Sequence, residues 1–357
     1  MYPVAAAITP LRLTATGIPK TVYVGSLCVL AGSHHYSTLS SIKARQTPVS
    51  SITTISRRGI SSTSLKRAIK DFFPRVETKQ IIETESTWQH PVYTEEQMRN
   101  IHNEHRDVRD WSDRFALTMV HWLRRGMDFV TGYHHPKPGQ VGEKFKMNER
   151  KWLNRILFLE SVAGVPGMVA GMLRHLRSLR TMRRDNGWIE TLLEEAYNER
   201  MHLLTFMKIA EPGLFMRVMV LGAQGVYFNG LFFAYLVSPR TCHRFVGYLE
   251  EEAVLTYTRI IQELQAGNLP EWQNMEAPEI AINYWKMPEG HRKMLDLMLY
   301  VRADEAKHRE VNHTLGNLNQ KEDPNPYTAI YRDTNKPRPS KGLDVVRPTG
   351  WERDEVI

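Results

Sequence analysis

The chain has 357 residues, of which 42% are hydrophobic, so it can bury a sizeable core and wholesale disorder is excluded. Its formal net charge of +8 arises at the N-terminus, because residues 1–70 hold nine Lys and Arg and no Asp or Glu. The remaining chain has 38 basic side chains (47 less 9) against 39 acidic ones, which excludes the basic surface of a nucleic-acid-binding protein.

Residues 1–60 have the composition of a mitochondrial transit peptide, rich in Ser, Thr and Arg and free of acids. The stretch Arg-Arg-Gly-Ile-Ser at 57–61 resembles a matrix-protease site, with cleavage after Ile60 or a few residues later. An ordinary basic tail is the alternative. The chain has two cysteines, Cys28 and Cys242, and cleavage would leave one, so no intrachain disulfide is expected and a reducing compartment fits.

Beyond a polar arm at 61–105, the chain reads as a series of helices, and the main domain is expected at 106–320. The first helix is expected from Trp111 to Tyr133, before a break rich in Pro and Gly. Five more are expected between Pro, Asn or Gly breaks, at about 148–184, 188–210, 212–237, 239–266 and 290–317. The tail at 321–357, rich in Pro and charge, is expected to be extended or disordered. No segment alternates with strand period for long, so the predicted fold is all-α.

Two of these helices carry a Glu-x-x-His tetrad, at Glu199–His202 and Glu305–His308. Three residues along a helix is about 300°, so each Glu and His lie on one face. Single glutamates stand on two further helices, at Glu160 and Glu250. Two helices that give Glu and two that give Glu-x-x-His form the ligand set of a di-iron carboxylate site in a ferritin-like four-helix bundle.

A single tetrad would arise by chance and would be interpreted as an exposed hydrogen-bonded pair. A third tetrad, Glu310–His313, lies about 140° round the helix from Glu305 and is expected to be a surface decoy. Glu160 stands in an apolar run, where a buried carboxylate costs several kcal/mol unless it is paired or binds metal. Two hydroxide-bridged iron ions would balance four such carboxylates, and this oxygen-rich set suits iron or manganese better than zinc.

Tyr257 follows Glu250 by seven residues, about 20° from the same helix face and roughly 10 Å along the axis. A phenol beside an oxidising metal centre could donate an electron and a proton. A core tyrosine that completes an apolar stripe is the equally good alternative.

Two segments are apolar enough to suggest a membrane. The stretch 214–237 has one charge in 24 residues and could cross ~30 Å of hydrocarbon, and 153–173 is nearly as apolar. Since 153–173 contains Arg155 and Glu160, we expect a bundle embedded in one leaflet rather than two spans or a multispan transporter. A basic stripe that could meet phospholipid headgroups, or simply face solvent, is formed by Arg174, His175, Arg177, Arg180 and Arg184.

Four motifs carry a resemblance to a known family. They are Leu-Glu160-Ser-Val-Ala-Gly-Val-Pro, Asn198-Glu199-Arg-Met-His202, Leu-Glu250-Glu-Glu-Ala253 and Arg-Ala-Asp304-Glu305-Ala-Lys-His308, within about residues 110–320. The chain closely resembles the mitochondrial alternative oxidases. The resemblance implies a cyanide-insensitive ubiquinol oxidase that oxidises two ubiquinols, reduces dioxygen to water at a non-haem di-iron centre and pumps no protons. It also implies a homodimer on the matrix-facing leaflet of the inner mitochondrial membrane.

The same resemblance assigns residues to roles. It implies a metal set of Glu160, Glu199, His202, Glu250, Glu305 and His308, and a redox-active tyrosine at Tyr257. Asn198 and Asp304 would orient the histidines by hydrogen bonding. The quinol pocket would be lined by Arg124, Arg155, Leu159, Ala253 and Thr256. The chain lacks the N-terminal regulatory cysteine of plant members, which indicates a fungal-type or protist-type member.

Two rival functions remain at this stage. A di-iron quinone hydroxylase would use similar tetrads and would release a hydroxylated product. An iron-storage or structural bundle protein would need the tetrads but no apolar membrane face.

Overall fold

The computed structural model describes residues 88–134, 146–333 and 335–357. The chain divides into two units, Met1–Lys66 and Arg67–Ile357, and all described residues belong to the second. The predicted transit peptide and the first part of the predicted arm lie outside the described residues.

The described part contains helices and no strand, which confirms the all-α fold. Its helices are α1 Glu95–Arg99, α2 Trp111–Thr131, α3 Glu149–Ala163, α4 Val165–Thr181, α5 Trp188–Ile209, α6 Leu214–Val237, α7 Pro239–Gln265, α8 Glu279–Trp285, α9 Met294–Asn317 and α10 Arg353–Val356.

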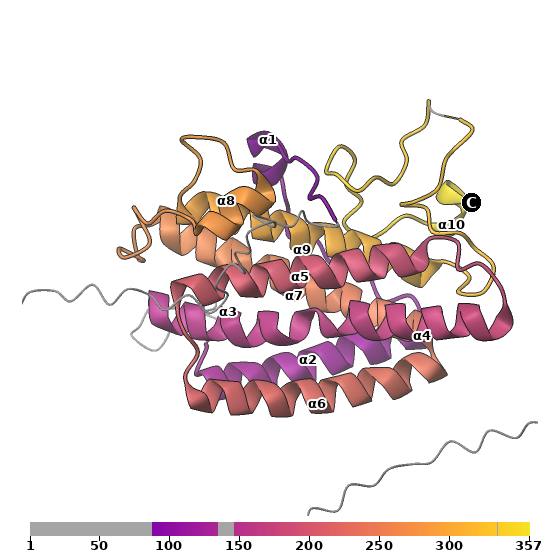
Figure 1. The fold of residues 1–357 in the computed structure, drawn as a ribbon, viewed down its shortest axis with the longest axis horizontal. Coiled ribbons are helices and arrows are strands. Elements are labelled where there is room, and N and C mark those ends of the chain that lie inside the picture. The colour runs from indigo at the N-terminus through magenta and orange to yellow at the C-terminus, as the bar shows by residue number, and fades with distance from the viewer. Residues whose placement is uncertain (1–87, 135–145, 334) are drawn as a thin grey trace, which may run out of the picture. The chain divides into compact units, whose positions relative to one another are not determined.

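Four helices form the central bundle. Helix α7 packs along α9, α3 packs against α5, and α5 also contacts α9. Helices α2, α4 and α6 pack around these four, and Figure 1 shows α2 and α6 running along one edge of the bundle. Local signals start several helices, since Asp110, Asn148 and Ser238 cap α2, α3 and α7 through their side chains.

The predicted helix at 148–184 is two helices. Helix α3 ends at Ala163 and α4 begins at Val165, with Gly164 between them. Pro166 explains the break, because proline has no N–H to donate and its ring collides with the carbonyl four residues earlier. Helix α8, which lies between the helices predicted at 239–266 and 290–317, was also not predicted.

The tail is extended but packed. Beyond Lys321 the chain is largely irregular, yet Asn325, Tyr327, Trp351 and Val356 are buried. Of the two predicted alternatives, extended or disordered, the structure has the extended one. The charged and Pro-rich composition did not indicate that a few large side chains pack on the bundle.

Helix α6 is the opposite case, an apolar helix that stays exposed. Of its 24 residues, only Leu231 and Tyr235 are buried. Trp111, Phe115 and Trp122 of α2 are exposed as well. Two helical stretches, 149–181 and 214–237, are long and apolar enough to cross a membrane, and the first is half buried inside the protein. Helices α2 and α6 thus both expose apolar side chains, and both run along one edge of the bundle in Figure 1.

Gly167 sets the distance between α4 and α5, and it supplies the first prediction. A Cβ added there would lie 2.5 Å from the carbonyl oxygen of Leu192. We expect Gly167→Ala to cost about 1–3 kcal/mol, since neither backbone can move without disturbing the bundle. Gly225→Ala is the matched control, because nothing lies within 4 Å of its added Cβ and alanine favours a helix by about 0.5–1 kcal/mol. Thermal unfolding in detergent measures both, and equal midpoints would contradict the prediction.

Candidate metal centre

The bundle brings the six predicted metal ligands together at its core. Helix α3 supplies Glu160, α7 supplies Glu250, and α5 and α9 each supply one Glu-x-x-His tetrad. Their ligand atoms form two clusters, in each of which all four atoms lie within 4.8 Å of one another. The first cluster is Glu160, Glu199, His202 and Glu305, and the second is Glu199, Glu250, Glu305 and His308. Glu199 and Glu305 belong to both clusters, so each would help to hold both ions of a two-ion site.

Five potential ligand atoms at this site make no hydrogen bond. Both carboxylate oxygens of Glu199 make no hydrogen bond, nor do Oε2 of Glu160 and Nδ1 of either histidine. Nδ1 of His202 lies 3.4 Å from one oxygen each of Glu160, Glu199 and Glu305. Such separations, about 3.0–3.5 Å, are expected between ligands that sit ~2.1 Å from a common ion. The residues present therefore fit a pair of metal ions.

Burial and mutual repulsion control the charge of these carboxylates. Burial raises the pKa of Glu160 to about 8. Burial also raises the pKa of Glu250 well above its usual value, together with repulsion from Glu305 and Glu199. Burial opposes the ionisation of Glu199 too, but the positive charges of His202 and His308 outweigh it and lower its pKa. Without a cation, the site therefore retains protons that metal ions would displace.

Asp304 holds one of the two histidines. Its Oδ2 accepts from Nε2 of His202 at 3.1 Å, from Nδ2 of Asn198 at 3.0 Å and from Nε1 of Trp285 at 2.9 Å. Its Oδ1 contacts Nε2 of His90 at 2.8 Å. His202 Nε2 is the donor, because its partner carboxylate keeps a pKa well below the usual range despite burial, through His90 and His202. The carboxylate fixes the ring so that Nδ1 faces the metal clusters.

Asn198 does not contact His202 directly. It donates to Asp304, which in turn accepts from His202. The sequence placed both residues around the histidines, but it did not find His90 or Trp285. His90 is 214 residues from Asp304 and comes from the segment before α1, so no local spacing could reveal it.

Tyr257 contacts the first cluster through Glu160, a different ligand from the one that Asp304 holds. Its hydroxyl donates to Oε1 of Glu160, and its ring stacks on Phe206 with centroids 6.5 Å apart. Burial, followed by the charge of Glu160, raises the pKa of Tyr257 well above its usual value, so the phenol stays protonated. The seven-residue spacing pointed to Glu250, whereas the structure brings the hydroxyl to Glu160 on α3.

An apolar cavity of about 350 Å³ adjoins the centre. Glu160, Glu250, Tyr257 and Glu305 are part of its wall. So are all five residues predicted for a quinol pocket: Arg124, Arg155, Leu159, Ala253 and Thr256.

Both arginines at the cavity already have acidic partners. Arg155 is 4% exposed and donates to Asp128 at 2.7 Å and to Thr131 at 2.8 Å, while its Nε makes no hydrogen bond. Arg124 pairs with Glu252 and lies 3.7 Å from Asp128. The Nε–H of Arg155 is thus left without an acceptor among the described residues.

The third tetrad is not part of either metal cluster, as expected, but it is not on the surface. Glu310 and His313 are both 0% exposed. The helical angle correctly placed Glu310 off the metal-binding face. The expected surface position was wrong, because α9 is covered on every side.

A four-helix bundle with two overlapping carboxylate and imidazole clusters, next to an apolar cavity, defines the class of carboxylate-bridged dinuclear metalloproteins. The alternative oxidase family model matches residues 93–317, so the chain belongs to that family. It is 68% identical over 305 residues to the mitochondrial alternative oxidase of Aspergillus niger, across 85% of this chain and 87% of that protein. It is 66% identical over 302 residues to that of Emericella nidulans, across 84% and 85%. The sequence-based assignment to this family is confirmed.

The raised pKa values predict opposite effects of pH on the metal-free and metal-loaded proteins. The pKa of Glu160 rises from 4.5 to about 8, and that of Glu195 rises from 4.5 to about 7, in both cases chiefly through burial. A raised folded-state pKa gives stability that is complete below the unfolded value and is lost as pH rises toward the folded one. We expect the metal-free protein to unfold at lower temperature at pH 8 than at pH 7. Metal binding, which displaces protons, should tighten over the same interval.

Unfolding of chelator-treated and iron-loaded protein at pH 7 and pH 8 checks this expectation. The comparison starts at pH 7 because burial lowers the pKa of His243 and His313 to about 4, which gives them the opposite sign at lower pH. Glu160→Gln is the control, and it should reduce the pH dependence of the metal-free protein. A metal-free protein that is more stable at pH 8 than at pH 7 would contradict the raised pKa values of Glu160 and Glu195.

Proposed function

We propose that this chain oxidises two ubiquinols and reduces one dioxygen to two waters at a centre of two iron ions, and that it pumps no protons. The observation that carries the proposal is the pair of ligand clusters sharing Glu199 and Glu305 next to an apolar cavity. Membership of the alternative oxidase family supports it. Each ubiquinol gives two electrons and two protons, and the four-electron reduction of dioxygen to water consumes all of them.

When bound, the iron pair supplies the site for dioxygen and the redox capacity that amino-acid side chains lack. Glu160, Glu199, His202, Glu250, Glu305 and His308 would hold the two ions. Asp304, with Asn198 behind it, keeps His202 oriented. The carboxylates that face the cavity are placed to accept protons from the quinol.

The cavity walls would bind and orient the quinol. Leu159 and Ala253 provide apolar surface that excludes water, and Thr256 adds a hydroxyl that already donates within its own helix. Arg155, through its Nε–H, which has no acceptor in the described part of the protein, would hold a quinol oxygen. Arg124 would serve the same cavity from α2.

Tyr257 would relay an electron between the quinol and the metal centre. Loss of an electron from a phenol makes its proton strongly acidic, and Oε1 of Glu160 stands ready to accept that proton. Return of the electron and proton restores the tyrosine, so the residue acts as a carrier.

Oxygen uptake driven by ubiquinol in the presence of cyanide tests the proposed function. We expect purified protein to contain close to two iron atoms per chain and to release ubiquinone and water. A hydroxylated quinone would instead indicate a hydroxylase, and iron uptake without quinol oxidation would indicate storage.

Tyr257→Phe tests the relay in the same assay. We expect the variant to keep its iron, because no metal ligand is lost, and its turnover to fall at least about 100-fold if the relay supplies roughly 3 kcal/mol of barrier lowering. Phe206→Leu, which changes the ring stacked on Tyr257 but not the phenol, is the control. Oxygen uptake near that of the unmodified protein would exclude the relay.

We also propose that the protein lies on the matrix-facing leaflet of the inner mitochondrial membrane without crossing it, bound to phospholipid as a homodimer. The relatives are named mitochondrial, and α2 and α6 present apolar side chains that a monomer in water would leave exposed. Residues 1–60 would be removed on import. Within the expected basic stripe, Arg174 is an exception, since it is buried, pairs with Asp185 at 2.9 Å and stacks on Trp188.

Charged substitutions on α6 test the membrane face. Leu221 and Val226 are 73% and 79% exposed. We expect Leu221→Glu and Val226→Glu each to weaken binding to cardiolipin-containing liposomes about 10-fold or more, since inserting one such side chain is worth about 1.5–3 kcal/mol. Ile330→Glu is the matched control, because Ile330 is 100% exposed but lies in the tail. Equal flotation of all three variants would contradict this orientation.

A further inference from the structure

The third Glu-x-x-His tetrad, at Glu310 and His313, has no part in the proposed chemistry, yet both side chains are fully buried. Glu310 is two residues beyond His308 on α9. Its Oε1 accepts from Trp351 Nε1 at 2.9 Å, Tyr327 OH at 3.1 Å and Lys307 Nζ at 3.2 Å. Its Oε2 accepts from the backbone N–H of Arg347 at 3.1 Å. Three of these four donors belong to residues 321–357, which we call the C-terminal strap.

The strap lies directly on the backbone of α9. Gly350 has φ +81°, and a Cβ there would approach atoms of His313 and Thr314 to 2.7 Å. The next residue, Trp351, donates its N–H to Oγ1 of Thr314 at 3.0 Å and accepts from Nδ2 of Asn317 at 2.8 Å. This register leaves no room for α9 to rotate beneath the strap.

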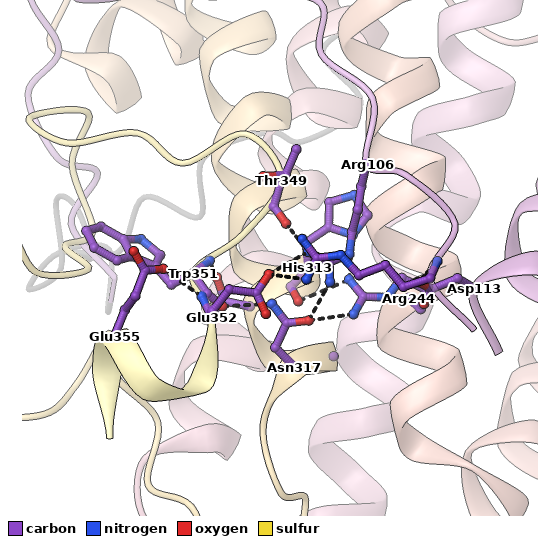
Figure 2. Close-up of polar contacts among 12 residues, drawn as sticks. Arg106, Asp113, Arg244, His313, Asn317, Thr349, Trp351, Glu352 and Glu355 are labelled. Carbon is purple, nitrogen blue, oxygen red and sulfur yellow. Dashed lines mark hydrogen bonds and ion pairs between the residues drawn. The ribbon is translucent and has the colours of Figure 1, made fainter. Parts of the chain in front are cut away.

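A polar cluster joins the strap and α9 to two other segments (Figure 2). Arg106, from the segment before α2, donates to the carbonyl of Thr349 at 2.6 Å and to Oδ1 of Asn317 at 2.9 Å. Arg244 of α7 donates to the same Oδ1 at 2.7 Å. Arg244 also donates to Nδ1 of His313 at 3.0 Å.

The other ring nitrogen of His313 connects the cluster to the metal-binding part of α7. Nε2 donates to Oε1 of Glu251 at 2.8 Å, and Glu251 directly follows the proposed ligand Glu250. Since burial lowers the pKa of His313 to about 4, the ring is neutral, with Arg244 as donor on one side and Glu251 as acceptor on the other. Strap contacts at Glu310, Thr314 and Asn317 thus directly follow the metal ligands along α9, while α7 is tied to the same cluster.

We propose that the C-terminal strap is a positioning element for the metal centre, which acts through Glu310 to fix the rotation of α9 and so the placement of Glu305 and His308. The inference rests on the proposed metal centre. A ligand atom about 6 Å from a helix axis moves about 1 Å when the helix rotates by 10°. Metal sites tolerate only about 0.2 Å in ligand distances. A small rotation of α9 therefore weakens metal binding while the bundle stays folded.

Glu310→Gln and Trp351→Phe in the full chain test this inference. The first puts an amide N–H₂ where an acceptor is needed, and the second removes one donor but keeps an aromatic ring. We expect both variants to bind two irons per chain but to lose them to excess chelator about 10-fold faster, the usual cost of disturbing groups that support ligands. Turnover should fall with little change in the KM for ubiquinol, because every residue of the cavity wall except Glu305 lies on helices other than α9. Asp354→Asn, an exposed acid in the same strap, is the control and should behave as the unmodified protein.

The double variant shows whether Trp351 acts through Glu310. Iron loss from Glu310→Gln/Trp351→Phe should be less than the product of the two single effects, because both changes break the same contact. Wild-type iron retention in the variants, even with a lower unfolding temperature, would overturn the inference, since the strap would then only add stability. If Glu310→Gln does not fold, the milder Trp351→Phe decides the question. Absence of iron from the unmodified protein would instead refute the proposed metal centre, and the inference with it.

Discussion

The convergence of four buried carboxylates is the constraint on which the rest of the structure depends. Glu160, Glu199, Glu250 and Glu305 are each at most 5% exposed, and their oxygens meet in two overlapping clusters. An unpaired carboxylate in such surroundings costs several kcal/mol, and four of them also repel one another. The two histidines supply only part of the compensation. Cations or protons must supply the remainder, which explains why burial drives the pKa of Glu160 and Glu250 upward.

The two sides of the centre differ in chemical character. One side admits the reductant, and the other fixes the orientation of a ligand. On one side an apolar cavity reaches Glu160, Glu250 and Tyr257, so an apolar reductant can approach the centre out of contact with water. On the other side Asp304 accepts from four surrounding side chains and fixes His202. Asp304 holds the ligand His202 in place, whereas the ligands Glu160 and Glu250 face an apolar surface. This arrangement suits a centre that exchanges electrons through the cavity while the opposite contacts keep its geometry fixed.

The sequence revealed those parts of the site that depend on local geometry. The Glu-x-x-His spacing works because both residues lie on one turn of one helix, and the apolar run around Glu160 marks burial directly. Contacts across long sequence separations were out of reach: His90 with Asp304, and Trp351 with Glu310. The same limit explains the error over Glu310. An angle on a helix tells which residues share a face, but only the packing of distant segments tells whether the other faces meet solvent. Helix boundaries were predicted well where Pro, Asn or Ser marks them, and the break at Pro166 was missed because the apolar pattern continues through it.

Helix α9 is unusual in that nearly every residue from Met294 to Gly316 is buried, although many of them are polar. A helix in that position cannot satisfy its polar side chains with water, so each face needs its own partners. One face has Glu305 and His308 at the metal clusters, another has Arg302 bound to the carbonyl of Met98, and a third has Glu310 under the strap. Because these partners come from segments far apart in the chain, α9 reaches its final position only when all of them are in place. The placement of Glu305 and His308 therefore depends on packing by distant segments, and substitutions remote from the metal clusters can be expected to act on it through this helix.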